Sequence, residues 1–113
     1  MMLTPNEVVS TLSKISKEID EQATIVADID LDATEKRVTY KREYYKAFLV
    51  AQGAIDLKKV TAEHQTIDLF RDAEYADSAL RAAREKLKVL RDRLEVGRSL
   101  GAIMRMEWSN GRE

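Results

Sequence analysis

The sequence contains no cysteine, a single proline and only four glycines in 113 residues. The absence of cysteine excludes disulfides, thiolate nucleophiles and sulfur-ligated zinc, and it fits a reducing cytoplasm. With 44% hydrophobic and 35% charged residues, the scarcity of proline and glycine favours long helices over strands joined by tight turns. Aromatic residues make up only 6% of the chain, so one copy has little material for a core. We therefore predict an all-α protein that associates with copies of itself.

Long hydrophobic runs are also missing. The longest uninterrupted run, residues 47–51, is far shorter than a membrane span. Residues 1–9 have neither the basic nor the apolar region of a signal peptide. These two observations predict a soluble, cytoplasmic protein that has no membrane partner.

No arrangement of residues typical of a catalytic or metal site is visible. The lone histidine, His64, has neither a second ligand at metal-binding spacing nor a nucleophile to activate. The alternating aspartates of residues 28–32 imitate the start of a calcium loop, but Ala33 stands where glycine is needed and Thr39 where the bidentate glutamate is needed. We interpret these aspartates as helix-capping residues and predict no catalytic residue, no metal and no cofactor.

Capping patterns divide the chain into predicted helices. A threonine, a proline and a glutamate at positions 4, 5 and 7 form a capping box with proline at the first helical position. A second such pattern at Asp32 and Glu35 predicts a kink or restart, without which the first two helices would form one rod. The predicted single domain, 1–108, contains helices over 5–28, 33–52 and 57–108, with room for a break near 60–70, and is followed by a flexible tail, 109–113.

The clearest periodicity lies between Leu69 and Trp108, where apolar or small residues alternate at spacings of four and three. This heptad spacing predicts a seam along a helix roughly 60 Å long. We expect an elongated helical hairpin or bundle in which the seam packs on other helices, including those of other copies. Gly97 and Gly101 lie on the seam with GxxxG spacing, which suits a close helix crossing or a hinge. The predicted oligomer interface comprises Leu80, Leu87, Leu90, Leu94, Gly97, Gly101, Met104, Arg84, Arg91 and Arg98.

Charge is divided into blocks although the net charge is only −1. The net charge is −6 over residues 1–35, +5 over 36–59, −4 over 60–80 and +4 over 81–113. Blocks of opposite sign can pair within a fold or between subunits, or they can leave basic faces for a polyanion. The sequence leaves both alternatives open.

Basic and aromatic residues alternate over residues 36–48. At 100° per residue, Tyr40 and Tyr44 fall on the core face of a helix, whereas Tyr45 lies among Lys41, Arg42 and Lys46. A ring in that position can stack on a nucleotide base while the cations contact phosphates. The alternative is a solvated basic face with a tyrosine at its edge.

A row of arginines recurs every seven residues along the last helix, at Arg84, Arg91, Arg98 and Arg105. Such a row flanks the apolar seam, with about 10 Å between neighbours. In a coiled coil these positions pair with acids on the adjacent helix, and a phosphate backbone is the second candidate partner. The two interpretations do not exclude each other.

The basic aromatic segment, the glycine at 53 followed by Lys58-Lys59, and the closing helix with its Leu90-Arg91-Asp92-Arg93-Leu94 motif together carry a resemblance. Over residues 36–107 the chain resembles small helical proteins of tailed phages and, more loosely, the UvsY-type recombination mediators. The resemblance implies a ring-like homo-oligomer in the host cytoplasm that binds single-stranded DNA and loads a RecA-like recombinase while displacing single-strand-binding protein. Carried over by position, the nucleic-acid-binding residues are Lys36, Arg37, Lys41, Arg42, Tyr45, Lys46, Lys58 and Lys59.

We therefore expect a single-stranded DNA-binding recombination mediator without catalytic activity. The alternative is a module that binds only protein, such as a phage inhibitor of a host system or an assembly scaffold. Such a module would use the same seam and charge blocks against a protein surface.

Overall fold

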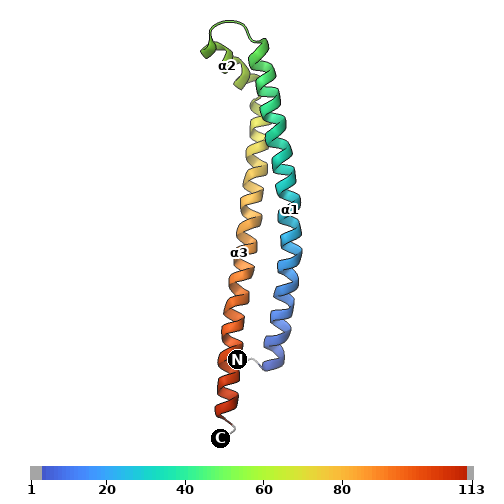
Figure 1. The fold of residues 1–113 in the computed structure, drawn as a ribbon, viewed down its shortest axis with the longest axis vertical. Helices are drawn as coiled ribbons and strands as arrows, with labels where there is room; N and C mark the ends of the chain where they lie inside the picture. Colours follow the sequence, from blue (N-terminus) through green and yellow to red (C-terminus); the bar gives the residue numbers. More distant parts are fainter. Residues whose placement is uncertain (1–3, 112–113) are drawn as a thin grey trace. The chain divides into compact units, whose positions relative to one another are not determined.

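The computed structural model describes residues 4–111, which fold into three helices. Helix α1 spans Pro5–Val50, α2 spans Ile55–Gln65 and α3 spans Ile67–Asn110 (Figure 1). No strand occurs within this range, so the predicted all-α fold class is confirmed. None of the helices in the described range is both long enough and apolar enough to cross a membrane.

The chain divides into two compact units. Unit 1 comprises Met1–Ile25 and Ala83–Glu113, and unit 2 comprises Val26–Ala82. Within each unit a segment of α1 lies beside a segment of α3 that runs in the opposite direction, as the colours in Figure 1 show. Helix α2 belongs to unit 2.

Helix α1 begins with the predicted capping box. The backbone N–H of Glu7 donates to Thr4 Oγ1 at 3.2 Å, and the backbone N–H of Thr4 donates to Glu7 Oε2 at 3.1 Å. These two bonds satisfy backbone donors that a helix start otherwise leaves without a partner. The predicted start is confirmed.

The predicted restart near Asp32 is wrong, because α1 continues without a break from Pro5 to Val50. Asp32 does not cap a helix. Its Oδ1 accepts a hydrogen bond from Lys36 Nζ at 2.7 Å, one turn further along. The next residue, Ala33, is buried in the helix pairing of unit 2. Because no proline or glycine interrupts this stretch, its backbone has no reason to leave the helix.

A glycine turn ends α1. Gly53 adopts a φ of 102°, a left-handed conformation in which a side chain would be strained. A Cβ at this position would also lie 2.7 Å from Leu57 Cδ2. Helix α2 then starts at Ile55, two residues before the predicted start at 57, so Lys58 and Lys59 are helical as predicted.

Thr66 separates α2 from α3, inside the range in which the sequence allows a break. Its side chain is buried, and its Oγ1 donates to the carbonyl of Ala62 at 2.7 Å. Its own carbonyl accepts from the N–H of Phe70 at 2.9 Å. The buried hydroxyl therefore has a partner at the junction.

At its other end α3 continues to Asn110, two residues beyond the predicted end at 108. The N–H of Gly111 still donates to the carbonyl of Glu107 at 2.9 Å. The first residues of the predicted tail are therefore helical, and residues 112–113 of that tail lie outside the described range.

The buried residues of α3 all lie on the predicted seam. Ala76, Leu80, Ala83, Leu87 and Leu90 are buried, and the other seam residues from Leu69 to Met104 are half-buried. Trp108, the last residue of the predicted seam, is 63% exposed. In unit 2, Ala76 and Leu80 form a core cluster with Ala33, against which Val26 and Ile29 pack. The heptad prediction of which face is apolar and inward is confirmed.

Gln22 shows how a polar residue fits into the seam of unit 1. The sequence places it as an interruption among apolar residues of α1, and the structure buries it. Its Nε2 donates to the carbonyl of Ala83 at 3.0 Å. A buried amide with a partner costs far less than one without, so this bond also favours one register of the two helices.

Candidate nucleic-acid interface

The basic aromatic segment lies on α1 within unit 2. Two of its tyrosines face inward, as predicted, and are half-buried. The ring of Tyr40 meets the ring of Phe70 on α3 edge-on, with 5.4 Å between centroids, and lies 6.1 Å from the ring of Tyr44. These contacts use Tyr40 and Tyr44 for packing, so much of their surface is covered.

Tyr45 points outward. Its side chain is 60% exposed, and its ring is 5.8 Å from that of Tyr44 in an edge-on arrangement. This contact limits where the ring can move while most of its surface remains accessible. A partly held, exposed aromatic ring is the arrangement on which an unpaired base can stack.

Lys41 and Arg42 lie one helical turn before Tyr45 and therefore on the same side of α1. Both are exposed. Within the part of the chain that the structure describes, neither side chain makes an ion pair or hydrogen bond. The two cations and the ring form a compact surface, which we call the Tyr45 face.

Two of the other predicted cations are already paired with acids. Lys36 pairs with Asp32 at 2.7 Å, and this hydrogen bond raises the pKa of Lys36 above its ordinary value. Lys46 lies 3.5 Å from Glu43. Both pairs are exposed and weak, but they leave these lysines less suited to phosphate than Lys41 and Arg42.

Arg37 lies one helical turn before Lys41. Both side chains line a hollow in unit 2 that also contains Glu74 and Asp77 of α3. Lys36 lines another hollow, beside Glu35 and Asp72. Lys36 lies on the opposite side of α1 from Tyr45, because nine residues correspond to about 180° around a helix. The structure therefore does not bring all eight predicted residues together.

Helix α2 brings one further cation to α1. Lys58 Nζ is 5.9 Å from the centroid of the Phe48 ring, which lies three residues after Tyr45. This cation–π contact places the ammonium group close to the Tyr45 face. Lys59 is exposed on the same short helix.

The half-buried Tyr40 predicts a pH dependence of stability. Burial raises the pKa of Tyr40, and the neighbouring Tyr44 adds to the effect. The unfolded chain therefore loses this proton at a lower pH than the folded chain does. The contribution of Tyr40 to stability is fully present below a pH of about 10 and is lost as the pH rises through the folded-state pKa. We expect Tyr40→Phe to lose less stability than the native chain between pH 9 and pH 11.5, measured by urea unfolding. An equal loss in both proteins would contradict this prediction.

In the arginine row of α3, Arg98 pairs with an acid, but not in the way that was predicted. Arg98 donates to Glu95 Oε1 at 2.9 Å, an ion pair within one helix and not with the neighbouring helix. Arg91 is exposed. Arg98 and Arg105 also border an apolar groove in unit 1.

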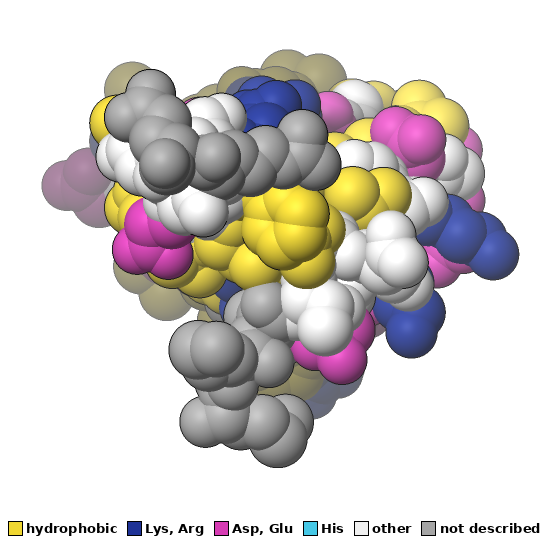
Figure 2. Space-filling view, turned by 90° about the horizontal axis from the view of Figure 1, so that it is seen from below, with side chains coloured by type: hydrophobic (Ala, Val, Ile, Leu, Met, Phe, Trp, Pro, Cys, Tyr) yellow, Lys and Arg dark blue, Asp and Glu magenta, His cyan; other side chains and the backbone are white. Residues whose placement is uncertain are grey.

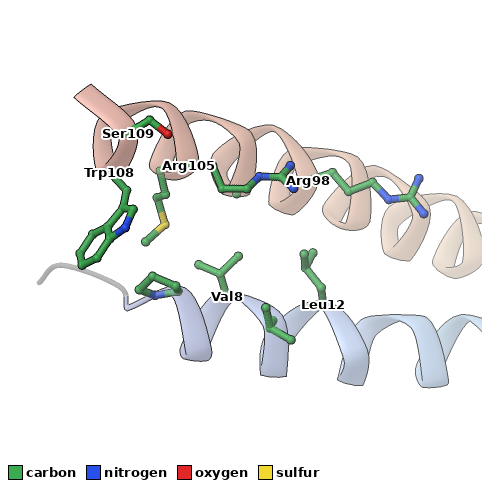
Figure 3. Close-up of a pocket in the computed structure, with 10 residues that line it drawn as sticks. Val8, Leu12, Arg98, Arg105, Trp108 and Ser109 are labelled. Carbon is green, nitrogen blue, oxygen red and sulfur yellow. The ribbon is translucent and has the colours of Figure 1, made fainter. Parts of the chain in front are cut away.

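This groove has a volume of about 630 Å³ and lies between the start of α1 and the end of α3. Figure 3 shows Val8 and Leu12 on one side, with Arg98, Arg105 and Trp108 on the other. Hydrophobic side chains gather at this end of unit 1 in Figure 2. The groove could not be predicted from the sequence, because it depends on which residues of two distant segments face each other.

The predicted close approach at the glycines occurs within the chain. A Cβ on Gly97 would lie 2.4 Å from Leu12 Cδ2, and one on Gly101 would lie 3.6 Å from Val8 Cγ1. The space beside Gly97 is thus occupied by the chain's own first helix. This contact explains why glycine stands on the seam at that point.

The predicted oligomer interface requires a similar correction. Leu80 is buried in the core cluster of unit 2, and Leu87 and Leu90 are buried in unit 1. These leucines are covered by a single chain, so they do not form a surface on which a second copy can dock. Self-association stays a prediction, and its contact has to involve other residues.

The residues considered for metal binding lie on helices. Alternate positions of a helix point in directions about 200° apart, so the aspartates of residues 28–32 do not converge on one point. No cluster of three potential metal ligands is found among residues 4–111. His64 is exposed on α2.

A search against protein families, curated proteins and solved structures finds no match for this chain.

Proposed function

We propose that this protein binds single-stranded DNA through the Tyr45 face and acts as a recombination mediator without a cofactor. The observation that carries the proposal is the exposed ring of Tyr45 beside two cations that have no acid partner in the described part of the chain. Stacking on Tyr45 would hold a base, while Lys41 and Arg42 would contact the flanking phosphates. The contacts require unpaired bases, so single strands are preferred over duplex.

The further parts of this role follow from the resemblance described above. They are self-association, the loading of a RecA-like recombinase and the displacement of single-strand-binding protein. The charge distribution agrees with a local binding surface, since a chain of net charge −1 has to use one basic block and not its overall charge.

A second function is favoured by a different observation. The groove of unit 1 and several exposed apolar side chains of α3 are surfaces typical of protein contacts. A module that binds only protein would use these surfaces and would leave the Tyr45 face in solvent.

Fluorescence anisotropy with a labelled oligothymidine separates the two functions. The first predicts binding that weakens as salt rises, with a slope of about −0.7 in log K against log salt for each phosphate contact. The three cations on or near the Tyr45 face, Lys41, Arg42 and Lys58, would give a slope of about −2. Absence of binding at low salt would exclude the DNA-binding function and leave the second.

Substitution of Tyr45 tests the stacking contact separately from the contacts of the cations with phosphates. We expect Tyr45→Ala to weaken oligonucleotide binding by about 1–3 kcal/mol, because the stacked base loses its platform. Tyr45→Phe keeps the ring and should bind like the native chain. The salt slope should be unchanged in both variants, since neither alters a phosphate contact. If Tyr45→Ala binds as tightly as Tyr45→Phe, the ring has no role in binding.

A further inference from the structure

Helix α3 carries a second apolar stripe, separate from its seam. Val89, Val96 and Ile103 recur every seven residues, and Leu100 lies between the last two at helical spacing. In unit 1 their side chains are exposed by 39%, 61%, 51% and 46%, respectively. We call these four residues the outer stripe.

The outer stripe points away from the pairing of α1 with α3. At 100° per residue, its centre is about 110° around the helix from the centre of the seam. A helix that has two apolar faces at this angle can pack against two different helices. One face is covered by α1, and the described chain leaves the other exposed, with Arg93 standing between Val89 and Val96. Exposed apolar side chains gathered on one face are typical of contact surfaces.

The two ends of the outer stripe have opposite charges. Lys86 lies three residues before Val89, and Glu107 lies four residues after Ile103. At these spacings both side chains lie on the same face of α3 as the outer stripe. Both are exposed. Neither side chain makes an ion pair or hydrogen bond with any other residue among those described. The stripe is therefore basic at one end and acidic at the other.

This pattern is complementary to itself in one direction only. If a second α3 runs antiparallel and the two-fold axis passes near Val96, then Lys86 faces Glu107 of the other copy and Val89 faces its Ile103. Arg93 falls opposite Leu100, whose surface the aliphatic part of an arginine side chain can cover. A parallel arrangement would instead place Lys86 against Lys86 and Glu107 against Glu107, which is unfavourable.

We propose that the outer stripe is the surface through which two copies of this chain associate, with their α3 helices antiparallel and Val96 at the two-fold axis. This inference deepens the self-association that belongs to the proposed function, and it replaces the seam leucines as the contact between copies. It does not require DNA, so it can fail or succeed independently of the Tyr45 face.

Single-cysteine variants test the proposal directly because the native chain has no cysteine. Under mild oxidation by copper phenanthroline, we expect Val96→Cys to form a disulfide-linked dimer. Arg91→Cys, an exposed position on the opposite side of α3, is the matched control and should stay monomeric on a denaturing gel. Circular dichroism before oxidation establishes that each variant is folded.

A mixture of two variants distinguishes the direction of pairing. We expect Val89→Cys to cross-link with Ile103→Cys and not with itself, since antiparallel packing brings those two positions together. Cross-linking of Val89→Cys with itself would indicate parallel helices and would overturn the proposal. Equal cross-linking of Val96→Cys and Arg91→Cys, or none in either, would overturn it as well.

Exchanging the charges of Lys86 and Glu107 tests the dimer contact independently, in variants that contain no cysteine. Lys86→Glu and Glu107→Lys should each weaken dimerisation about three- to tenfold in sedimentation equilibrium, and the double variant should recover most of the loss. Failure of the double variant to recover would show that these two side chains do not meet.

Discussion

Replacing both Lys41 and Arg42 by glutamate is expected to weaken binding of single-stranded oligonucleotide on the order of 100-fold at 0.1 M salt. Each lost phosphate contact removes about 0.7 from the salt slope, which corresponds to roughly fivefold in affinity at this salt concentration. Two lost contacts give about 25-fold, and repulsion by the two introduced carboxylates adds to the loss. Anisotropy titrations at several salt concentrations measure both the affinity and the slope.

The matched control is Lys14→Glu together with Lys17→Glu. These lysines are also exposed on α1 and change the total charge by the same amount, but they belong to unit 1. Their reversal should lower the affinity only slightly, through the overall charge of the protein. If both double variants lose the same affinity, binding depends on net charge and not on the Tyr45 face.

The sequence alone was enough to predict the face of α3 that is buried. Heptad spacing repeats over many turns, and each turn adds to the same stripe, so errors at single positions do not change the result. The capping box at Thr4 was predictable for a related reason, because all its partners lie within four residues. The outward position of Tyr45 follows from the same helical geometry.

Pairing between distant segments was not predictable in this way. The seam could have met a second copy or the chain's own α1, and nothing in its spacing distinguishes the two. The identity of the partner became clear only through contacts such as Gln22 with the carbonyl of Ala83 and Leu12 beside Gly97. The groove of unit 1 depends on the same register.

Ion pairs with nearby residues explain the remaining differences between the predictions and the structure. Asp32 has the right residue type and spacing for a cap, but a lysine one turn later offers its carboxylate an ion pair and the backbone stays helical. Lys36 and Lys46 likewise have nearby acids, which a count of basic residues does not reveal. Two lysines of the predicted DNA-binding set are therefore less available to phosphate than Lys41 and Arg42.

Leu80→Ala is expected to destabilise the protein by about 2–5 kcal/mol. Leu80 is only 4% exposed and packs in unit 2 with Ala33 and Ala76, which are too small to fill the space that its removal would leave. The lost burial and the cavity both act against folding, while the helix propensity of alanine acts slightly in its favour. Urea unfolding followed by circular dichroism should show a lower midpoint at an unchanged slope.

Leu31→Ala makes the same chemical change at an exposed position of the same unit. Leu31 is 66% exposed on α1, so its replacement should alter stability by less than about 0.5 kcal/mol. The difference between the two variants isolates burial, because side-chain type and helical context are matched. A small effect of Leu80→Ala would mean that α1 and α3 do not pack through the seam in solution. In that case the seam would again be available to other copies, and the outer stripe would lose its role as the separate contact between them.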